Sequence, residues 1–182
     1  MKKILTIAFL LCLVCSTAFA DKVYTDPHGV SLDIPDGYQL VAKRELPTEN
    51  KYETTFADSA AIEKAQKEIM ITSQISSSGP PNTINDFSEQ ELADISNDVF
   101  KKLATINIKA LNNPNYKKVT VNGYPAIVII LDETYQYNNY LVYGYYIIKD
   151  TKVITITYAC PKNKSDEFLP IIEKSINTLY IE

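Results

Sequence analysis

The sequence has one histidine, no tryptophan and only five glycines in 182 residues. The glycines are scattered, so no loop of the kind that cradles a phosphate or a dinucleotide is present. A single histidine excludes the paired-histidine zinc motifs of helices. The Gly-x-Ser-x-Gly pattern and, after residue 20, the Ser-x-x-Lys pattern of serine enzymes are also missing. We therefore predict no catalytic residues, no cofactor and no bound metal.

Cysteine is scarce, and two of the three cysteines lie in an N-terminal segment typical of an export signal. Lys2 and Lys3 precede an apolar run, and Ala18-Phe19-Ala20 supplies the small residues that a signal peptidase reads. The run is shorter than the roughly 20 apolar residues of a membrane-spanning helix. Neither Cys12 nor Cys15 follows a small residue, so we expect cleavage without a lipid anchor.

Cleavage would leave residues 21–182, a length that suits one domain. Loss of Lys2 and Lys3 takes the 18 basic side chains to 16 against 22 acidic ones, a net charge of −6. An acidic chain without long basic runs is a poor ligand for nucleic acid or anionic membranes. Only Cys160 would remain, so the domain would contain no internal disulfide.

Four strand-like runs separated by turns predict an antiparallel meander at residues 116–121, 125–134, 140–148 and 153–159. Asn122-Gly123 between the first two is a strong hairpin signal, because both residues tolerate the positive φ of a type I′ turn. Residues 126–131 are apolar in succession, which predicts a strand covered on both faces.

Two amphipathic helices could provide that cover. Ser88 and Glu91 form a capping box ahead of one apolar stripe, and a second stripe runs from Phe168 to Leu179, where Pro170 suggests a late start or a bend. The predicted class is α+β, an antiparallel sheet with helices on both faces. Further expectations are a hairpin at 23–41, a loop at 43–51, a helix at 59–66 and a strand at 68–76.

Three stretches resemble the PsbP-like and Mog-type superfamily. They are Tyr24-x-Asp26-x-x-Gly29-Val30-Ser31-Leu32-Asp33-Ile34-Pro35-Asp36-Gly37-Tyr38, Asn122-Gly123-Tyr124-Pro125-Ala126, and Ile154–Pro161 with the following Phe168–Leu179. The founding members are an extrinsic protein of photosystem II and a nuclear regulator that binds the Ran GTPase, and many exported bacterial proteins of unassigned role share the fold. The resemblance implies an α/β/α sandwich and a non-catalytic adaptor or binding module. No functional residue of either founder matches a position here.

Six tyrosines fall between residues 135 and 146, and they are the candidate binding residues. Tyrosine is enriched at interfaces because a large apolar ring ends in a hydrogen-bonding hydroxyl. We single out Tyr135, Tyr137, Tyr140 and Tyr146, with Gly144 leaving a notch beside the last two. The competing interpretation is that these rings only fill the rim of the sheet core.

The leading hypothesis is an exported, non-catalytic module that binds an envelope or extracellular protein through this end of the sheet. The alternative is a small-ligand carrier, or a thiol-dependent enzyme that uses Cys160 and His28, with a pocket between sheet and helix. The acidic pairs Asp94/Asp98 and Asp132/Glu133 are expected to be solvated rather than to bind a metal.

Processing gives the first testable prediction. The exported protein should begin at Asp21, because the small residues before it fit the specificity of signal peptidase. Intact-mass measurement of protein recovered after export checks this. A mass that includes residues 1–20, or a lipid on Cys15, would contradict it.

Overall fold

The computed structural model describes residues 22–58, 67–77, 79, 83–105, 109–110, 116–135 and 138–182, without the side chains of 22, 99–105, 109–110 and 135. The helix expected at 59–66 and the candidate Tyr137 lie outside these residues. In the described ranges, no helix is both long and apolar enough to cross a membrane.

The structure contains two sheets. The strands are β1 (Lys22–Thr25), β2 (Val30–Ile34), β3 (Tyr38–Leu46), β4 (Lys51–Asp58), β5 (Glu68–Ile75), β6 (Lys109–Ala110), β7 (Tyr116–Val121), β8 (Tyr124–Tyr135), β9 (Asn138–Lys149), β10 (Lys152–Pro161) and β11 (Tyr180–Ile181). The large sheet has the order β3-β4-β5-β10-β9-β8-β6, with β7 also paired to β8, and the small sheet has the order β1-β2-β11. The helices are α2 (Glu89–Thr105) and α3 (Ser165–Ile176), and the 3₁₀ turns are η1 (Pro47–Glu49), η2 (Ile84–Asp86) and η3 (Lys162–Lys164).

The predicted meander is confirmed. Strands β7 to β10 follow one another as antiparallel neighbours. The first hairpin turns at Asn122 and Gly123, whose φ angles of 43° and 87° are the positive values that a type I′ turn requires. The last hairpin turns at Asp150, which also has a positive φ, of 55°. Turn chemistry therefore sets the pairing register of the strands on either side.

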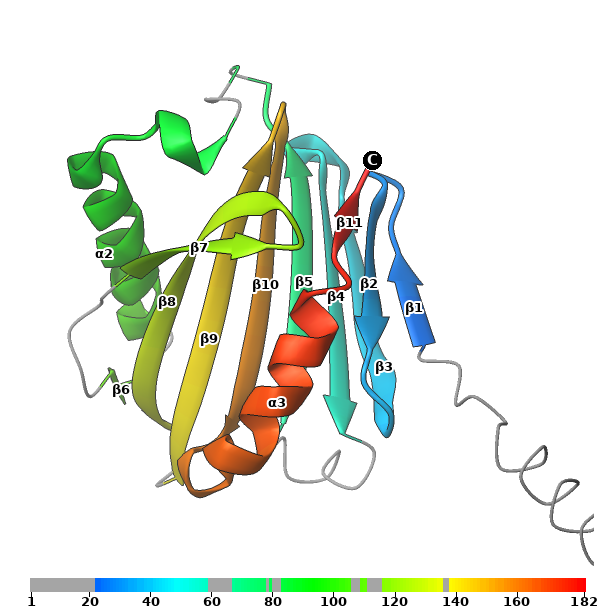
Figure 1. The fold of residues 1–182 in the computed structure, drawn as a ribbon, viewed down its shortest axis with the longest axis vertical. Coiled ribbons are helices and arrows are strands. Elements are labelled where there is room, and N and C mark those ends of the chain that lie inside the picture. Colours follow the sequence, from blue (N-terminus) through cyan, green and yellow to red (C-terminus); the bar gives the residue numbers. More distant parts are fainter. Residues whose placement is uncertain are drawn as a thin grey trace, which may run out of the picture.

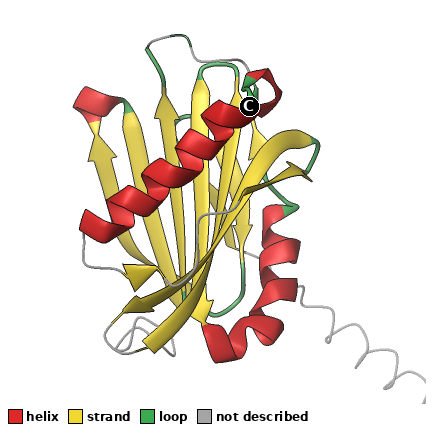
Figure 2. Ribbon diagram, turned by 90° about the vertical axis from the view of Figure 1, so that its left-hand side faces the viewer, coloured by secondary structure: helices red, strands yellow, loops and turns green. Residues whose placement is uncertain are grey.

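The large sheet is the middle layer of the molecule, as its doubly apolar strand predicts. On one face Val128 and Ala126 join the core formed with α3 and the small sheet. On the other face Ile127 and Ile129 pack in a second core under η2 and α2. Figure 1 shows α3 lying beside the small sheet, and Figure 2 shows α2 crossing the other side. The α+β sandwich with helices on both faces is confirmed.

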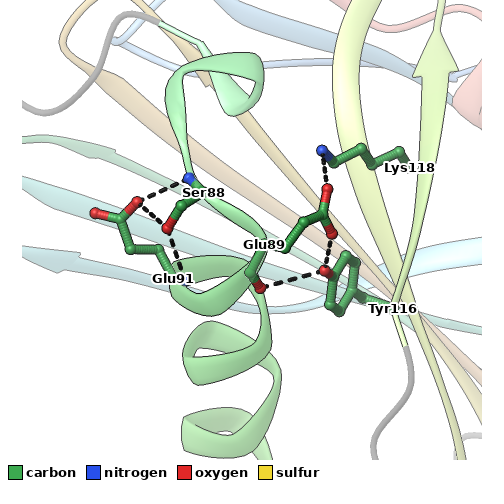
Figure 3. Close-up of polar contacts among 5 residues, drawn as sticks. All are labelled: Ser88, Glu89, Glu91, Tyr116 and Lys118. Carbon is green, nitrogen blue, oxygen red and sulfur yellow. Dashed lines mark hydrogen bonds and ion pairs between the residues drawn. The ribbon is translucent and has the colours of Figure 1, made fainter.

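Helix α2 begins with the predicted capping box. The Ser88 backbone N–H donates to Glu91 Oε2 at 2.8 Å, and the Glu91 N–H donates to Ser88 Oγ at 3.3 Å (Figure 3). The next residue ties the helix to β7, because the Glu89 carboxylate accepts from the Tyr116 hydroxyl and from Lys118 Nζ (Figure 3). These two donors, the lysine first, hold the pKa of the Glu89 carboxyl below its usual value.

Two local expectations need correction. Helix α3 starts at Ser165, so Pro170 lies inside it and does not delay its start; a bend at Pro170 stays a prediction. Residues 43–46 continue strand β3, and β4 begins at Lys51, which leaves only the η1 turn where a longer loop was expected. Here the pairing of β3 with β4 outweighs the polar composition that suggested a loop.

Tyr158 tests the core beneath α3. Its ring is fully buried, and its hydroxyl lies 3.0 Å from Ser175 Oγ. We expect Tyr158→Ala to lower the free energy of unfolding by about 3 to 5 kcal/mol, and Tyr158→Phe by about 1 kcal/mol. Chemical denaturation measures both, with Tyr180→Ala as the exposed control. Equal losses for Tyr158→Ala and Tyr180→Ala would contradict this account.

Candidate functional site

The structure places the predicted tyrosines unevenly. Tyr140 begins the buried part of β9 and is 9% exposed, while Tyr146 is partly buried against the core under α2. The side chain of Tyr135 and the whole of Tyr137 lie outside the described residues. Tyr140 and Tyr146 are therefore largely packed rather than displayed as a flat aromatic patch, because both point to the face that α2 covers.

The notch expected at Gly144 is occupied by the ring of Tyr146, two residues further along the same strand. A Cβ placed on Gly144 would lie 3.6 Å from Cε2 of Tyr146, which is ordinary van der Waals contact. Burial raises the pKa of the Tyr146 hydroxyl to about 12, so it stays protonated at neutral pH. This part of the strand serves packing, and a ligand surface must be sought nearer Tyr140.

A cleft of about 550 Å³ lies beside Tyr140, where strand β9 begins and η3 follows β10. These ends of β9 and β10 are at the bottom of Figure 1. We name this cleft the η3 cleft. It is lined by Asn138, Asn139, Tyr140, Pro161, Lys162, Asn163 and Lys164. Two segments far apart in sequence meet here because the antiparallel register sets Tyr140 opposite Pro161. The volume falls within the roughly 300 to 1,000 Å³ of typical ligand sites.

The rim of the η3 cleft carries two lysines, each of which forms an ion pair with a nearby carboxylate. Lys162 Nζ lies 3.0 Å from an Asp132 carboxylate oxygen, and Lys164 Nζ lies 3.1 Å from Glu167 Oε1. Both lysine side chains remain about half exposed, so they can still contact a ligand. Next to Tyr140 in the sheet, Glu133 is buried, and desolvation raises the pKa of its carboxyl.

Sequence reasoning named only Tyr140 among the residues that line this cleft. Apart from Pro161, the other lining residues are asparagines and lysines. Taken one at a time in the sequence, such residues predict only an exposed surface. The signal that could have found them is strand register: in an antiparallel pair, the start of β9 must meet the end of β10. The Lys-Asn-Lys run after Pro161 could therefore have been placed beside Tyr140.

His28 and Cys160 show no sign of acting as a catalytic pair. Both ring nitrogens of His28 already have partners, because Nδ1 lies 3.0 Å from Ser73 Oγ and Nε2 lies 3.3 Å from Asn50 Oδ1. The ring also packs edge-on against Tyr52, at 4.8 Å between centroids. His28 thus fastens the turn between β1 and β2 onto the large sheet.

Cys160 is a free, fully buried thiol in the core beneath α3. Burial raises its pKa to about 11, the opposite of the shift that activates a nucleophilic cysteine. A buried thiol of this kind packs as a small apolar side chain. Among the described residues, no group of three or more potential ligands could hold a metal ion.

A second hollow lies between the β2–β3 turn and α3. It measures about 280 Å³ and is lined by Asp33, Ile34, Pro35, Asp36, Pro170, Ile171, Lys174 and Ser175. Its position matches the pocket between sheet and helix expected for a ligand carrier. It is about half the volume of the η3 cleft, just below the usual range for ligand sites.

The state of Cys160 is testable. Because the thiolate is the reactive form, a pKa of about 11 leaves only about one thiol in a thousand ionised at pH 8. We expect a maleimide or iodoacetamide reagent to label native protein very slowly and unfolded protein rapidly, as followed by mass spectrometry. Fast labelling of the native protein at pH 7 would show an activated thiol instead.

Comparison with known proteins found no matching family model and no matching curated sequence. Solved structures do match. Cyanobacterial PsbP (CyanoP) from Synechocystis sp. PCC 6803 aligns with a TM-score of 0.60 at 13% identity, covering 92% of this chain and 96% of that one.

Two further structures match over most of this chain. A protein from Bacteroides thetaiotaomicron VPI-5482 aligns with a TM-score of 0.57 at 14% identity, over 90% of this chain but only 49% of its own. LpqN, involved in cell envelope biogenesis of Mycobacterium tuberculosis, aligns with a TM-score of 0.52 at 10% identity, covering 88% of this chain and 89% of that one.

Such low identities establish architecture rather than activity. With a large sheet covered on both faces, a small sheet that joins β1 and β2 to β11, and helices α2 and α3 in the described residues, this chain has the PsbP-like fold.

Proposed function

We propose that this protein is a non-catalytic binding module of the cell envelope, and that it binds a protein partner in the η3 cleft. The observation that carries the proposal is the meeting of Tyr140 with amide and lysine side chains from a second segment. Convergence of distant segments on one concave surface is typical of a binding site.

The chemistry of the cleft favours a polar segment with carboxylate or hydroxyl groups. The amides of Asn139 and Asn163 can both donate and accept hydrogen bonds, and the exposed lysines add positive charge to an acidic protein. Tyr140 supplies an apolar wall at the inner side of the cleft. Such a mixed rim resembles the polar borders of non-obligate interfaces.

Two observations favour a location in the cell envelope. The N-terminal residues have the pattern of an export signal. LpqN, a protein involved in cell envelope biogenesis, has a similar fold, which supports the location by analogy. The buried thiol of Cys160 and the engaged ring of His28 favour a binding role over a thiol-dependent reaction.

The smaller hollow beside α3 is the second candidate. Its walls include Ile34, Pro35 and Ile171, so it suits a small apolar group rather than a polar segment. A ligand carrier would use this hollow, and its occupation would leave the η3 cleft unaffected. The two candidates can therefore be separated by where a bound molecule is found.

Site-specific photocrosslinking tests the proposal. A benzoylphenylalanine at position 163, in the cleft, should crosslink the exported protein to a discrete envelope protein, whereas the same group at exposed position 117 on β7 should not. Replacing both Lys162 and Lys164 by Gln should reduce the crosslink several-fold, because the cationic rim is lost. Circular dichroism confirms that the variants fold.

Two outcomes would contradict the proposal. One is an equal pattern of crosslinks from positions 163 and 117, which would indicate random contact. The other is an absence of crosslinks at 163 together with a small molecule bound beside Ile171, found by native mass spectrometry and lost on Ile171→Asp.

A further inference from the structure

Strand β3 is an exposed edge of the large sheet. Among the strands that the structure describes, it pairs only with β4 and ends the strand order. Its residues 39–45 are exposed in succession, and Leu40 and Val41 are 53% and 46% exposed. A strand with an open edge presents backbone N–H and C=O groups to which another strand can pair.

Only part of this edge is regular enough to pair. The register with β4 shifts between Leu40 and Ala42, which marks a bulge at Val41. At the other end, Pro47 begins the η1 turn and has no N–H to donate. The usable edge is therefore the five residues from Ala42 to Leu46.

Bulges and charged side chains commonly protect an edge from pairing with itself. The charges here are arranged differently, because Lys43 and Glu45 lie symmetrically on either side of Arg44. An antiparallel pair of identical segments is related by a two-fold axis, so each residue meets the one at the mirror position. With the axis at Arg44, Lys43 of each copy faces Glu45 of the other.

Other registers are unfavourable. In an antiparallel pair, alternate residues turn their backbone groups toward the partner, so the register can slip only in steps that keep this alternation. A slip to either side puts Lys43 opposite Lys43 or Glu45 opposite Glu45, and it also shortens the paired segment. Like charges directly opposite each other destabilise a sheet.

We propose that β3 is a self-association surface, on which a second copy of this chain pairs antiparallel, centred on Arg44. The two Arg44 side chains would approach each other at the axis, on the opposite face from Lys43. In each copy Arg44 lies 3.9 Å from Glu53 of β4, a carboxylate that also pairs with Lys51 at 2.7 Å. Glu53 therefore offsets only part of the repulsion between the two arginines, and the two Lys43–Glu45 pairs must outweigh the rest. On that same face Ala42 would meet Leu46, a small residue against a large apolar one.

A charge exchange tests this pairing. The exported protein should form dimers in sedimentation runs that extend to about 1 mM. Lys43→Glu should raise the dissociation constant about tenfold, because two attractive pairs per dimer become repulsive. Glu45→Lys should do the same, and the double variant should recover wild-type association because the pairs are exchanged.

Mixing the two single variants is the decisive measurement. In the mixed dimer every Glu faces a Lys, so dimers should form between the two variants but not within either one. Lys117→Glu, on exposed β7, changes the net charge equally and should leave association unchanged. Glu45→Gln keeps an acceptor for the Tyr52 hydroxyl and controls for loss of that contact.

Three results would overturn the proposal. One is wild-type protein that stays monomeric throughout the concentration series. Another is a dimer whose dissociation constant ignores the charge reversals, which would place the contact elsewhere. The third is hydrogen-exchange protection of residues 42–46 that appears only when a different envelope protein is added, since the occupant would then not be a second copy.

Discussion

The central constraint on this structure is a sheet whose middle strands are apolar on both faces. Ile127 and Ile129 on one face of β8, and Ala126 and Val128 on the other, must all leave water. Burial of each isoleucine or valine side chain contributes roughly 1.5 to 3 kcal/mol, so neither face can remain bare. Helix α3 and the small sheet cover one face, and helix α2 covers the other.

The same packing determines which chemistry is available. Titratable side chains that point into the cores, including Cys160, Tyr146 and Tyr158, stay protonated because desolvation disfavours their charged forms. Polar groups that can contact a ligand are consequently found at the ends of strands and along the uncovered edge of the sheet. The η3 cleft lies at strand ends, and β3 is the uncovered edge. Two separate surfaces would allow ligand binding and self-association to coexist.

Local sequence signals predicted most of the meander well. Asn122-Gly123 indicated the hairpin because few other residues accept its backbone angles. Ser88 with Glu91 indicated the helix start because each side chain accepts a hydrogen bond from the other residue's backbone N–H. The local signals failed at β3, where the charged residues suggested a loop but belong to an edge strand that faces water on both sides. The tyrosine cluster stays a prediction as a binding site, and the burial of Tyr140 depended on cover from elsewhere in the chain.

By itself the sequence determined the class of fold, the strand order of the C-terminal half and the expectation of export, because periodicity, turn residues and signal patterns act over a few neighbouring positions. Only the tertiary structure decided which polar residues share a surface. Asn163 and Asn139 are far apart along the chain, and they come to line one cleft only through the register that pairs Tyr140 with Pro161. The turn at Asp150 sets that register locally, but which strand ends stay uncovered and form a cleft depends on packing of the whole sheet, which local propensity does not specify.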